Sequence, residues 1–164
     1  MSNIKPLFYS AFLLSCTLTA LAAWAQSTSN NPVAVNTSLN DLQHHRWVLR
    51  DIDGMDLQAY AVNLGFDQDD RLRKIPELDF GEQGHVEGNT GCNQIQGQAR
   101  VEGNQLIMSS LASTRMFCAG FAGELELKLS MLYTDPLAIS REGEMLILQS
   151  SDTTLRFQLK DWVQ

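Results

Sequence analysis

The stretch IQGQARVEGNQLIM, residues 95–108, predicts two β-strands joined by a turn at EGNQ. Its turn contains glycine and asparagine, which tight hairpin turns favour because both residues tolerate a positive φ angle. The stretch ELDFGEQGHVEG, residues 77–88, predicts the same strand–turn–strand arrangement upstream, again with glycines at the turn. This middle part of the chain is therefore expected to form antiparallel hairpins.

Further strands are predicted on both sides of these hairpins. RWVLRDIDG, residues 46–54, contains β-forming side chains and ends at an Asp-Gly turn. EMLILQ and TLRFQLKDW, residues 144–149 and 154–162, predict two more strands joined by SSDT. Residues 55–76 are compatible with either a short helix or an irregular insertion.

GELELKLSMLY, residues 123–133, has a helical period instead of an alternating one. Asp135-Pro136 ends this helix, because proline cannot continue it and restricts the residue before it. Many short strands and one amphipathic helix predict an α+β fold with a curved antiparallel sheet or small barrel, as one domain over residues 39–164. The helical side chains expected to share one buried face are Leu125, Leu129, Leu132 and Tyr133.

Residues 1–25 are typical of a secretory signal peptide. Lys5 is their only charged residue, and the apolar run LFYSAFLLSCTLTALAA follows it. We expect cleavage between Ala25 and Gln26, then a flexible polar tether over residues 26–38. The protein is accordingly expected in the periplasm or outside the cell.

Cys16 opens an alternative to soluble export. It follows Leu-Leu-Ser, so it could be lipidated, which would make the protein a membrane-anchored lipoprotein. A retained signal is a third possibility, because the apolar run approaches the roughly 20 residues that span a bilayer. Membrane association is expected only in these two cases.

The charge balance argues against nucleic acid as a partner. The 164 residues carry 12 basic and 19 acidic side chains, a net charge of −7, which repels phosphate backbones. The one short basic run, RLRK at residues 71–74, directly follows the acidic DQDD. No basic patch offsets the overall repulsion.

Cys92 and Cys118 are the cysteines that remain after signal cleavage. Paired thiols in an oxidising compartment tend to form disulfides, so we expect a structural Cys92–Cys118 bond. Two free buried thiols, a redox-active pair, and a catalytic Cys92 assisted by a histidine such as His85 are the alternatives.

Three motifs resemble the META domain family: LQHHRWVLRDIDG at residues 42–54, GCNQIQG at 91–97, and ASTRMFCAG at 112–120 before an acidic amphipathic helix. The resemblance extends over residues 42–162. It implies a small antiparallel β-barrel-like sheet with one packed helix, located in the cell envelope. It also implies a role in heat-stress and novobiocin tolerance, without catalytic residues.

Metal and cofactor sites are not expected. His44 and His45 are adjacent, so in a strand their side chains point to opposite faces and cannot hold one ion together. DIDGMDLQAYAV, residues 51–62, lacks the closing glutamate of an EF-hand loop. The carboxylates expected to lie in solvated turns are Asp51, Asp53, Asp56, Asp67, Asp69 and Asp70.

The glycine-rich GNTGCN, residues 88–93, lacks the ending of a phosphate-binding loop, so we expect no nucleotide cofactor. Gly88, Gly91 and Gly97 are instead expected at turns, bulges or close backbone contacts.

Arg115 lies among apolar residues just before Cys118. We expect a structural role for it, either as an exposed strand residue or as a buried guanidinium paired with Glu124 or Glu126.

These observations predict a non-catalytic envelope stress-response protein that binds an unknown protein or small molecule. A lipocalin-like module with an apolar internal cavity is one alternative. A thiol-redox protein with an exposed disulfide is the other.

Overall fold

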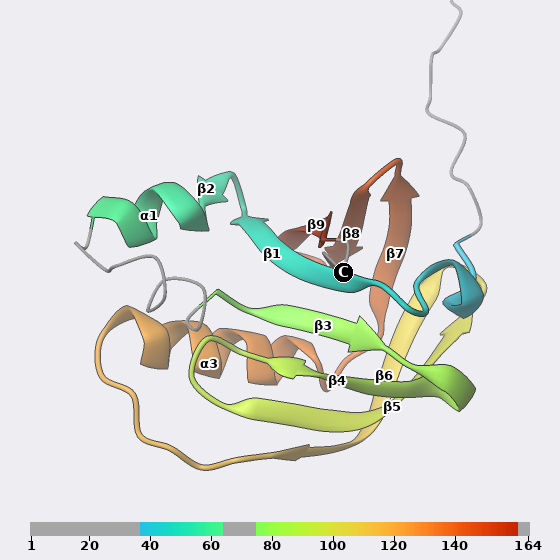
Figure 1. Ribbon diagram of the computed structural model, residues 1–164, viewed down its shortest axis with the longest axis horizontal. Helices are drawn as coiled ribbons and strands as arrows, with labels where there is room; N and C mark the ends of the chain where they lie inside the picture. Colours follow the sequence, from blue (N-terminus) through green and yellow to red (C-terminus); the bar gives the residue numbers. More distant parts are fainter. Residues whose placement is uncertain (1–36, 64–74, 161–164) are drawn as a thin grey trace, which may run out of the picture. The chain divides into compact units, whose positions relative to one another are not determined.

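Within the described residues, nine strands join edge to edge in one antiparallel sheet (Figure 1). The computed structural model describes residues 37–63 and 75–160. These belong to the unit Pro32–Gln164, one of two into which the chain divides. The predicted signal segment with Cys16 and the carboxylates of Asp67, Asp69 and Asp70 lie outside the described residues. Among the helices described, none is both long and apolar enough to cross a membrane.

The sheet closes into a barrel. Its order is β2-β1-β3-β4-β5-β6-β7-β8-β9, and β9 also pairs with β1, so eight strands form a ring to which β2 is added. This confirms the expected α+β fold with a small antiparallel barrel. The strands are β1 (Arg46–Ile52), β2 (Met55–Asp56), β3 (Glu77–Phe80), β4 (His85–Asn89), β5 (Gln94–Glu102), β6 (Gln105–Ser113), β7 (Leu137–Glu142), β8 (Met145–Gln149) and β9 (Thr154–Lys160).

Alternating burial along the strands fills the barrel. In β8 and β9 the buried residues face one another across the pair, Leu146 opposite Phe157 and Leu148 opposite Leu155. Each strand therefore turns one face to the interior and one to solvent, as the period of two requires. The described core forms a single cluster of buried side chains.

β1 departs from strict alternation through a bulge. Its pairing with β9 shifts register between Leu49 and Asp51, which returns Ile52 to the interior beside Leu49 and Trp47. The Trp47 indole Nε1 donates a hydrogen bond to the Leu42 carbonyl at 3.2 Å, so the buried ring has no unmet donor.

α3 (Phe121–Leu132) is the predicted amphipathic helix. Leu125, Leu129 and Tyr133 are buried in the core, and Leu132 packs against it from a half-buried position. The prediction of a helix with this inner face is confirmed. The Tyr133 hydroxyl has no hydrogen-bond partner among the described residues, and burial raises its pKa.

One strand of the ring, β7, was not predicted from the sequence. β7 follows the helix after Pro136, and its pattern of buried Leu137 and Ile139 around exposed Ala138 is the period-two signal that could have revealed it. α1 (Leu57–Asn63) forms a short helix where either a helix or an insertion was expected. Single turns of 3-10 helix also occur at η1 (Leu39–Asp41) and at η2 (Glu82–Gly84), between β3 and β4.

The glycines singled out in the sequence allow close backbone contact or a turn. A Cβ atom on Gly88 would lie 2.1 Å from the Glu77 carbonyl oxygen, and one on Gly97 would lie 2.7 Å from that of Ser109. Gly91 has a φ of 92°, a value that side-chain-bearing residues rarely adopt.

Candidate functional site

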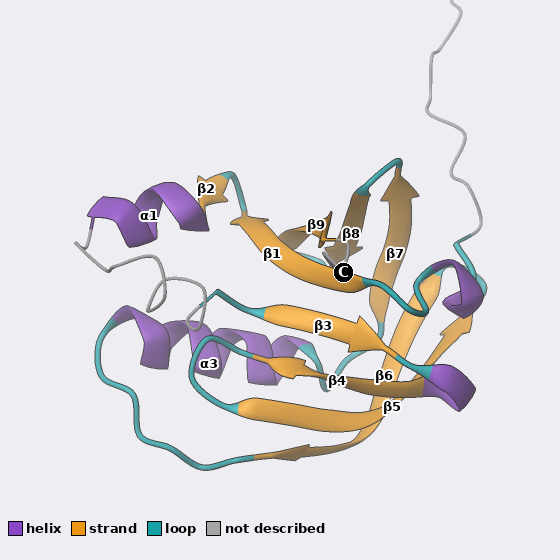
Figure 2. Cartoon of the chain, in the orientation of Figure 1, coloured by secondary structure: helices purple, strands orange, loops and turns teal. Residues whose placement is uncertain are grey.

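Cys92 and Cys118 are joined by a disulfide that links two connecting segments of the fold. Cys92 lies between β4 and β5, and Cys118 lies in the loop between β6 and α3 (Figure 2). Their Cα atoms are 6.1 Å apart, within the range that a disulfide bridges. Both residues are half-buried.

Asn93 fixes the backbone of the loop next to this bond. Its Oδ1 accepts hydrogen bonds from the Met116 amide at 2.7 Å and from Thr114 Oγ1 at 2.9 Å. Its Nδ2 donates to the Met116 carbonyl at 3.3 Å. One buried side chain thereby bonds both backbone groups of Met116, as a neighbouring strand would.

Glu126 of α3 connects the helix to the same region. Its carboxylate accepts hydrogen bonds from the backbone amide of Asn93 at 3.1 Å, from the Thr90 hydroxyl, and from Ser130 Oγ at 3.0 Å. Thr90 and Asn93 are both buried, so their polar groups need these partners. The two loops and the helix thus form one polar network.

An apolar surface next to this network is exposed to solvent. Residues 114–117, which we term the exposed segment, are all exposed. Phe117 has 93% of its surface accessible, and Met116 has 59%. An aromatic residue so exposed on a backbone so well fixed is unusual, because large apolar side chains normally gain free energy from burial.

Arg115 lies within the exposed segment, between Thr114 and Met116. It is exposed, and it makes no ion pair or hydrogen bond with the described residues. Of the two positions expected for Arg115, the structure shows the exposed one. The alternative, a buried pairing with Glu124 or Glu126, is not formed, and Glu126 accepts from Thr90 and Asn93. Proximity along the chain indicates the acidic residues as one alternative for Arg115, whereas the role of Asn93 depends on contacts across the fold and has no such local signal.

His85 is remote from Cys92. It begins β4 opposite Gln98, whereas Cys92 follows the other end of that strand, beyond Asn89 opposite Gln94. His85 lies instead 3.9 Å from the Glu87 carboxylate. His85 is therefore not placed to assist Cys92.

The His45 ring and the Asp53 carboxylate contact other protein groups. His44 is exposed, and the His45 ring packs edge-on against Trp47 with centroids 6.2 Å apart. Asp53 accepts hydrogen bonds from the Thr154 amide at 2.7 Å and from Lys128 Nζ at 2.9 Å. Both bonds lower the pKa of Asp53, and the bond from the Thr154 amide has the larger effect.

Asp51 and Asp56 also accept hydrogen bonds from protein groups. Asp51 accepts from the Gly54 amide at 2.9 Å and from Arg156 at 3.0 Å. Asp56 accepts from the Gln58 and Ala59 amides at the start of α1, and the pKa of Asp56 is lowered chiefly by the Ala59 bond. In the described ranges, no cluster of three or more potential metal ligands occurs.

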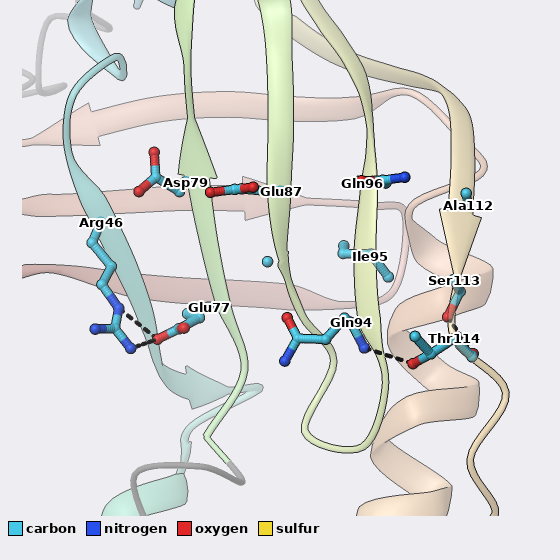
Figure 3. Close-up of a pocket in the computed structure, with 11 residues that line it drawn as sticks. Arg46, Glu77, Asp79, Glu87, Gln94, Ile95, Gln96, Ala112, Ser113 and Thr114 are labelled. Atoms are coloured by element: carbon cyan, nitrogen blue, oxygen red, sulfur yellow. Dashed lines mark hydrogen bonds and ion pairs between the residues drawn. The ribbon is translucent and has the colours of Figure 1, made fainter.

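A pocket of about 570 Å³ lies on the outer face of β1, β3, β4, β5 and β6 (Figure 3). Arg46 pairs there with Glu77, its Nε donating at 2.7 Å. Burial raises the pKa of Asp79, and the Glu87 carboxylate adds to the rise while Arg46 opposes it. Most of the side chains that line the pocket are polar, and the pocket lies on the solvent side of the sheet, whereas a lipocalin-like carrier would hold its ligand inside. Core side chains occupy that interior.

The model of one protein family, the META domain, matches residues 40–162. The chain belongs to the META domain family. This confirms the resemblance carried by the three motifs. This protein is also 29% identical to heat shock protein HslJ of Escherichia coli (strain K12) over 138 residues. The aligned region covers 84% of this chain and 88% of HslJ.

Solved structures share the META domain fold seen here. One protein solved by NMR is 27% identical, with a TM-score of 0.62 over 78% of this chain and 99% of its own. A protein from Burkholderia xenovorans, also solved by NMR, is 20% identical, with a TM-score of 0.55 over 81% of this chain and 96% of its own. A crystal structure of a DUF4847 family protein from Bacteroides vulgatus ATCC 8482 is 13% identical, with a TM-score of 0.51 over 73% and 94%. The last two likenesses concern the fold alone.

Proposed function

We propose that the protein is a non-catalytic binding protein of the cell envelope that supports survival under stress, and that the exposed segment is its contact surface. The observation that carries the proposal is Phe117, 93% exposed beside a backbone fixed by Asn93 and a disulfide. Aromatic residues and methionine are enriched where proteins bind one another, because each buries a large apolar area on contact. The partner proposed is therefore a protein.

A role in stress is supported by the similarity to a protein named heat shock protein HslJ. Tolerance of heat and of novobiocin is the phenotype expected. The envelope location is supported by the signal-like residues 1–25 and by a pair of cysteines close enough to bond, which suits an oxidising compartment. A binding role rather than a catalytic one is supported by the separation of His85 from Cys92 along β4.

The contact surface is tested by complementation in the native host. A strain lacking the gene receives the wild-type chain, Phe117→Ser or Leu127→Ser at matched levels, and survival is measured after heat shock and in novobiocin. Leu127 is the control, because it exposes 64% of its surface on α3, outside the exposed segment. We expect Phe117→Ser to lose most of the rescue and Leu127→Ser to keep it. Full rescue by Phe117→Ser would refute the assignment of the surface.

Location is tested on the same strains by fractionation and intact mass. Soluble periplasmic protein beginning at Gln26, with a mass shift on reduction, is the expected result. Lipid on Cys16 would place the same domain at a membrane. Recovery of the unprocessed, reduced chain from the cytoplasm would contradict the envelope proposal.

A further inference from the structure

β6 lacks a strand neighbour along most of one side. Within the described residues it pairs with β7 through Gln105 and Leu106 alone, whereas it pairs with β5 as far as Ser113. Figure 1 shows the second half of β6 and the loop after it along the lower margin of the molecule, with no ribbon beyond them in that view. The chain there forms the border of the sheet.

The exposed segment continues this border beyond the end of β6. On its inner side the Thr114 amide donates to the Gln94 carbonyl at 3.1 Å, and the Met116 amide donates to Asn93 Oδ1 at 2.7 Å. Successive amides of an extended chain point in opposite directions, so those of Arg115 and Phe117 point outward. Neither residue makes a backbone hydrogen bond with the described residues.

Such a row of unpaired groups is what an added strand requires. Unpaired N–H and C=O groups at a sheet edge pair readily with another extended chain. The outward groups of Arg115 and Phe117 are two positions apart, roughly 7 Å in a strand, a spacing that the backbone of a second strand matches. The Asn93 bonds and the disulfide already fix the segment, so little conformational freedom is lost on binding.

We infer that the exposed segment binds an extended polypeptide with large apolar side chains by β-strand addition. The backbone groups of Arg115 and Phe117 hydrogen-bond the added strand, and the exposed Met116 and Phe117 side chains contact its apolar residues. Chains of this kind are exposed when a protein is partly unfolded. The inference rests on the proposed function, because it names the class of partner for that same surface.

The test separates backbone from side chain at one position. Arg115→Pro removes the outward N–H together with the side chain, whereas Arg115→Ala removes only the side chain. The probe is reduced, carboxymethylated α-lactalbumin, a permanently unfolded chain whose blocked thiols cannot attack the disulfide. Binding to the purified protein is measured by fluorescence anisotropy, and exchange of the Phe117 amide is followed by NMR.

We expect the wild type and Arg115→Ala to bind within about threefold of each other, and Arg115→Pro to bind at least about tenfold more weakly, because a net hydrogen bond is lost. The Phe117 amide should exchange freely in the unbound protein and slow on addition of the probe. A near-native melting temperature for Arg115→Pro shows that the loss is not unfolding.

Equal binding by the proline and alanine variants, or no binding by the wild type, would overturn the inference. If Phe117→Ser still abolished stress rescue, the proposed function would stand with a different mode of contact. A concentration-dependent dimer lost in Arg115→Pro but kept in Arg115→Ala would assign the edge to a second copy of the chain and would also overturn the inference.

Discussion

The seam formed by β8, β9 and β1 and the region between β6 and α3 are held together by different forces. At the seam every strand is paired on both sides, and buried side chains such as Phe157 and Leu148 supply the stabilisation. Between β6 and α3 the strand pairing ends, and Asn93, Glu126 and a disulfide take its place. The first arrangement builds a scaffold, and the second holds a short apolar surface in solvent at fixed geometry.

Two phenylalanines give the largest test of this contrast. Phe157→Ala empties a fully buried position at the seam and should lower the free energy of unfolding by about 3–5 kcal/mol. Phe117→Ala removes a side chain already in water and should change it by less than about 0.5 kcal/mol. Urea titration of both variants measures the difference. Comparable losses would mean that the exposed segment is packed in solution.

The disulfide gives the next largest effect. It closes a loop between residues 26 positions apart, so replacing both cysteines by serine should cost about 3.5 kcal/mol through the entropy of the unfolded chain. Urea unfolding with and without reductant measures this, and the double variant serves as a control that reductant should not affect. If reductant leaves the wild type unchanged, the bond is not formed in solution.

Asn93→Ala should have an intermediate effect, about 1–3 kcal/mol, because it leaves both backbone groups of Met116 without their partner. Gln94→Ala is the matched control, since the neighbouring Gln94 side chain is exposed. Amide exchange should accelerate at Met116 while remaining slow in β8 and β9. Faster exchange throughout the barrel would show that the two regions unfold together.

Two carboxylates should respond to pH in opposite directions, each by less than about 1 kcal/mol after solvent screening. In the folded state the pKa of Asp53 lies below 3.8, the value of the unfolded chain, so Asp53 stabilises the fold above pH 3.8. That stabilisation is lost as the pH falls through the pKa of the folded state. The raised pKa of Asp79 costs stability above 3.8, and the cost disappears on acidification.

Urea titrations of Asp53→Asn and Asp79→Asn from pH 7 to pH 2 test this. At neutral pH the first variant should be less stable than the wild type and the second more stable. Both differences should vanish at low pH. Shifts of the same sign would show that the two environments do not differ as the structure indicates.

The sequence predicts most of the fold because burial is periodic. Alternation in the stretches at β5–β6 and β8–β9, and the helical spacing of Leu125 and Leu129, arise from the same division into inner and outer faces. β7 was missed, although Leu137 and Ile139 carry that signal, because it begins directly after the proline that ends the helix region. The closure of β9 on β1 has no local signature, since the two strands are far apart in sequence.

The candidate site was less predictable from the sequence. The cysteine pair could be expected from compartment and number, but the Asn93 contacts with Met116 depend on how two loops meet. Arg115 stands out in the sequence and Phe117 does not, because an exposed phenylalanine cannot be distinguished from a buried one in a single sequence. Asn93 directly follows Cys92, and this polar neighbour was the available hint of a fixed loop.

Because β1 pairs with β9, the barrel does not depend on where in the ring the chain begins and ends. Arg46 lies opposite Lys160, so the two ends of the described barrel lie side by side and a short linker could join them. New ends opened at Gly143, in the exposed turn between β7 and β8, would leave the paired strands of the ring in place. Circularly permuted chains of this kind should fold to the same barrel, with the exposed segment on an uninterrupted stretch of the new sequence.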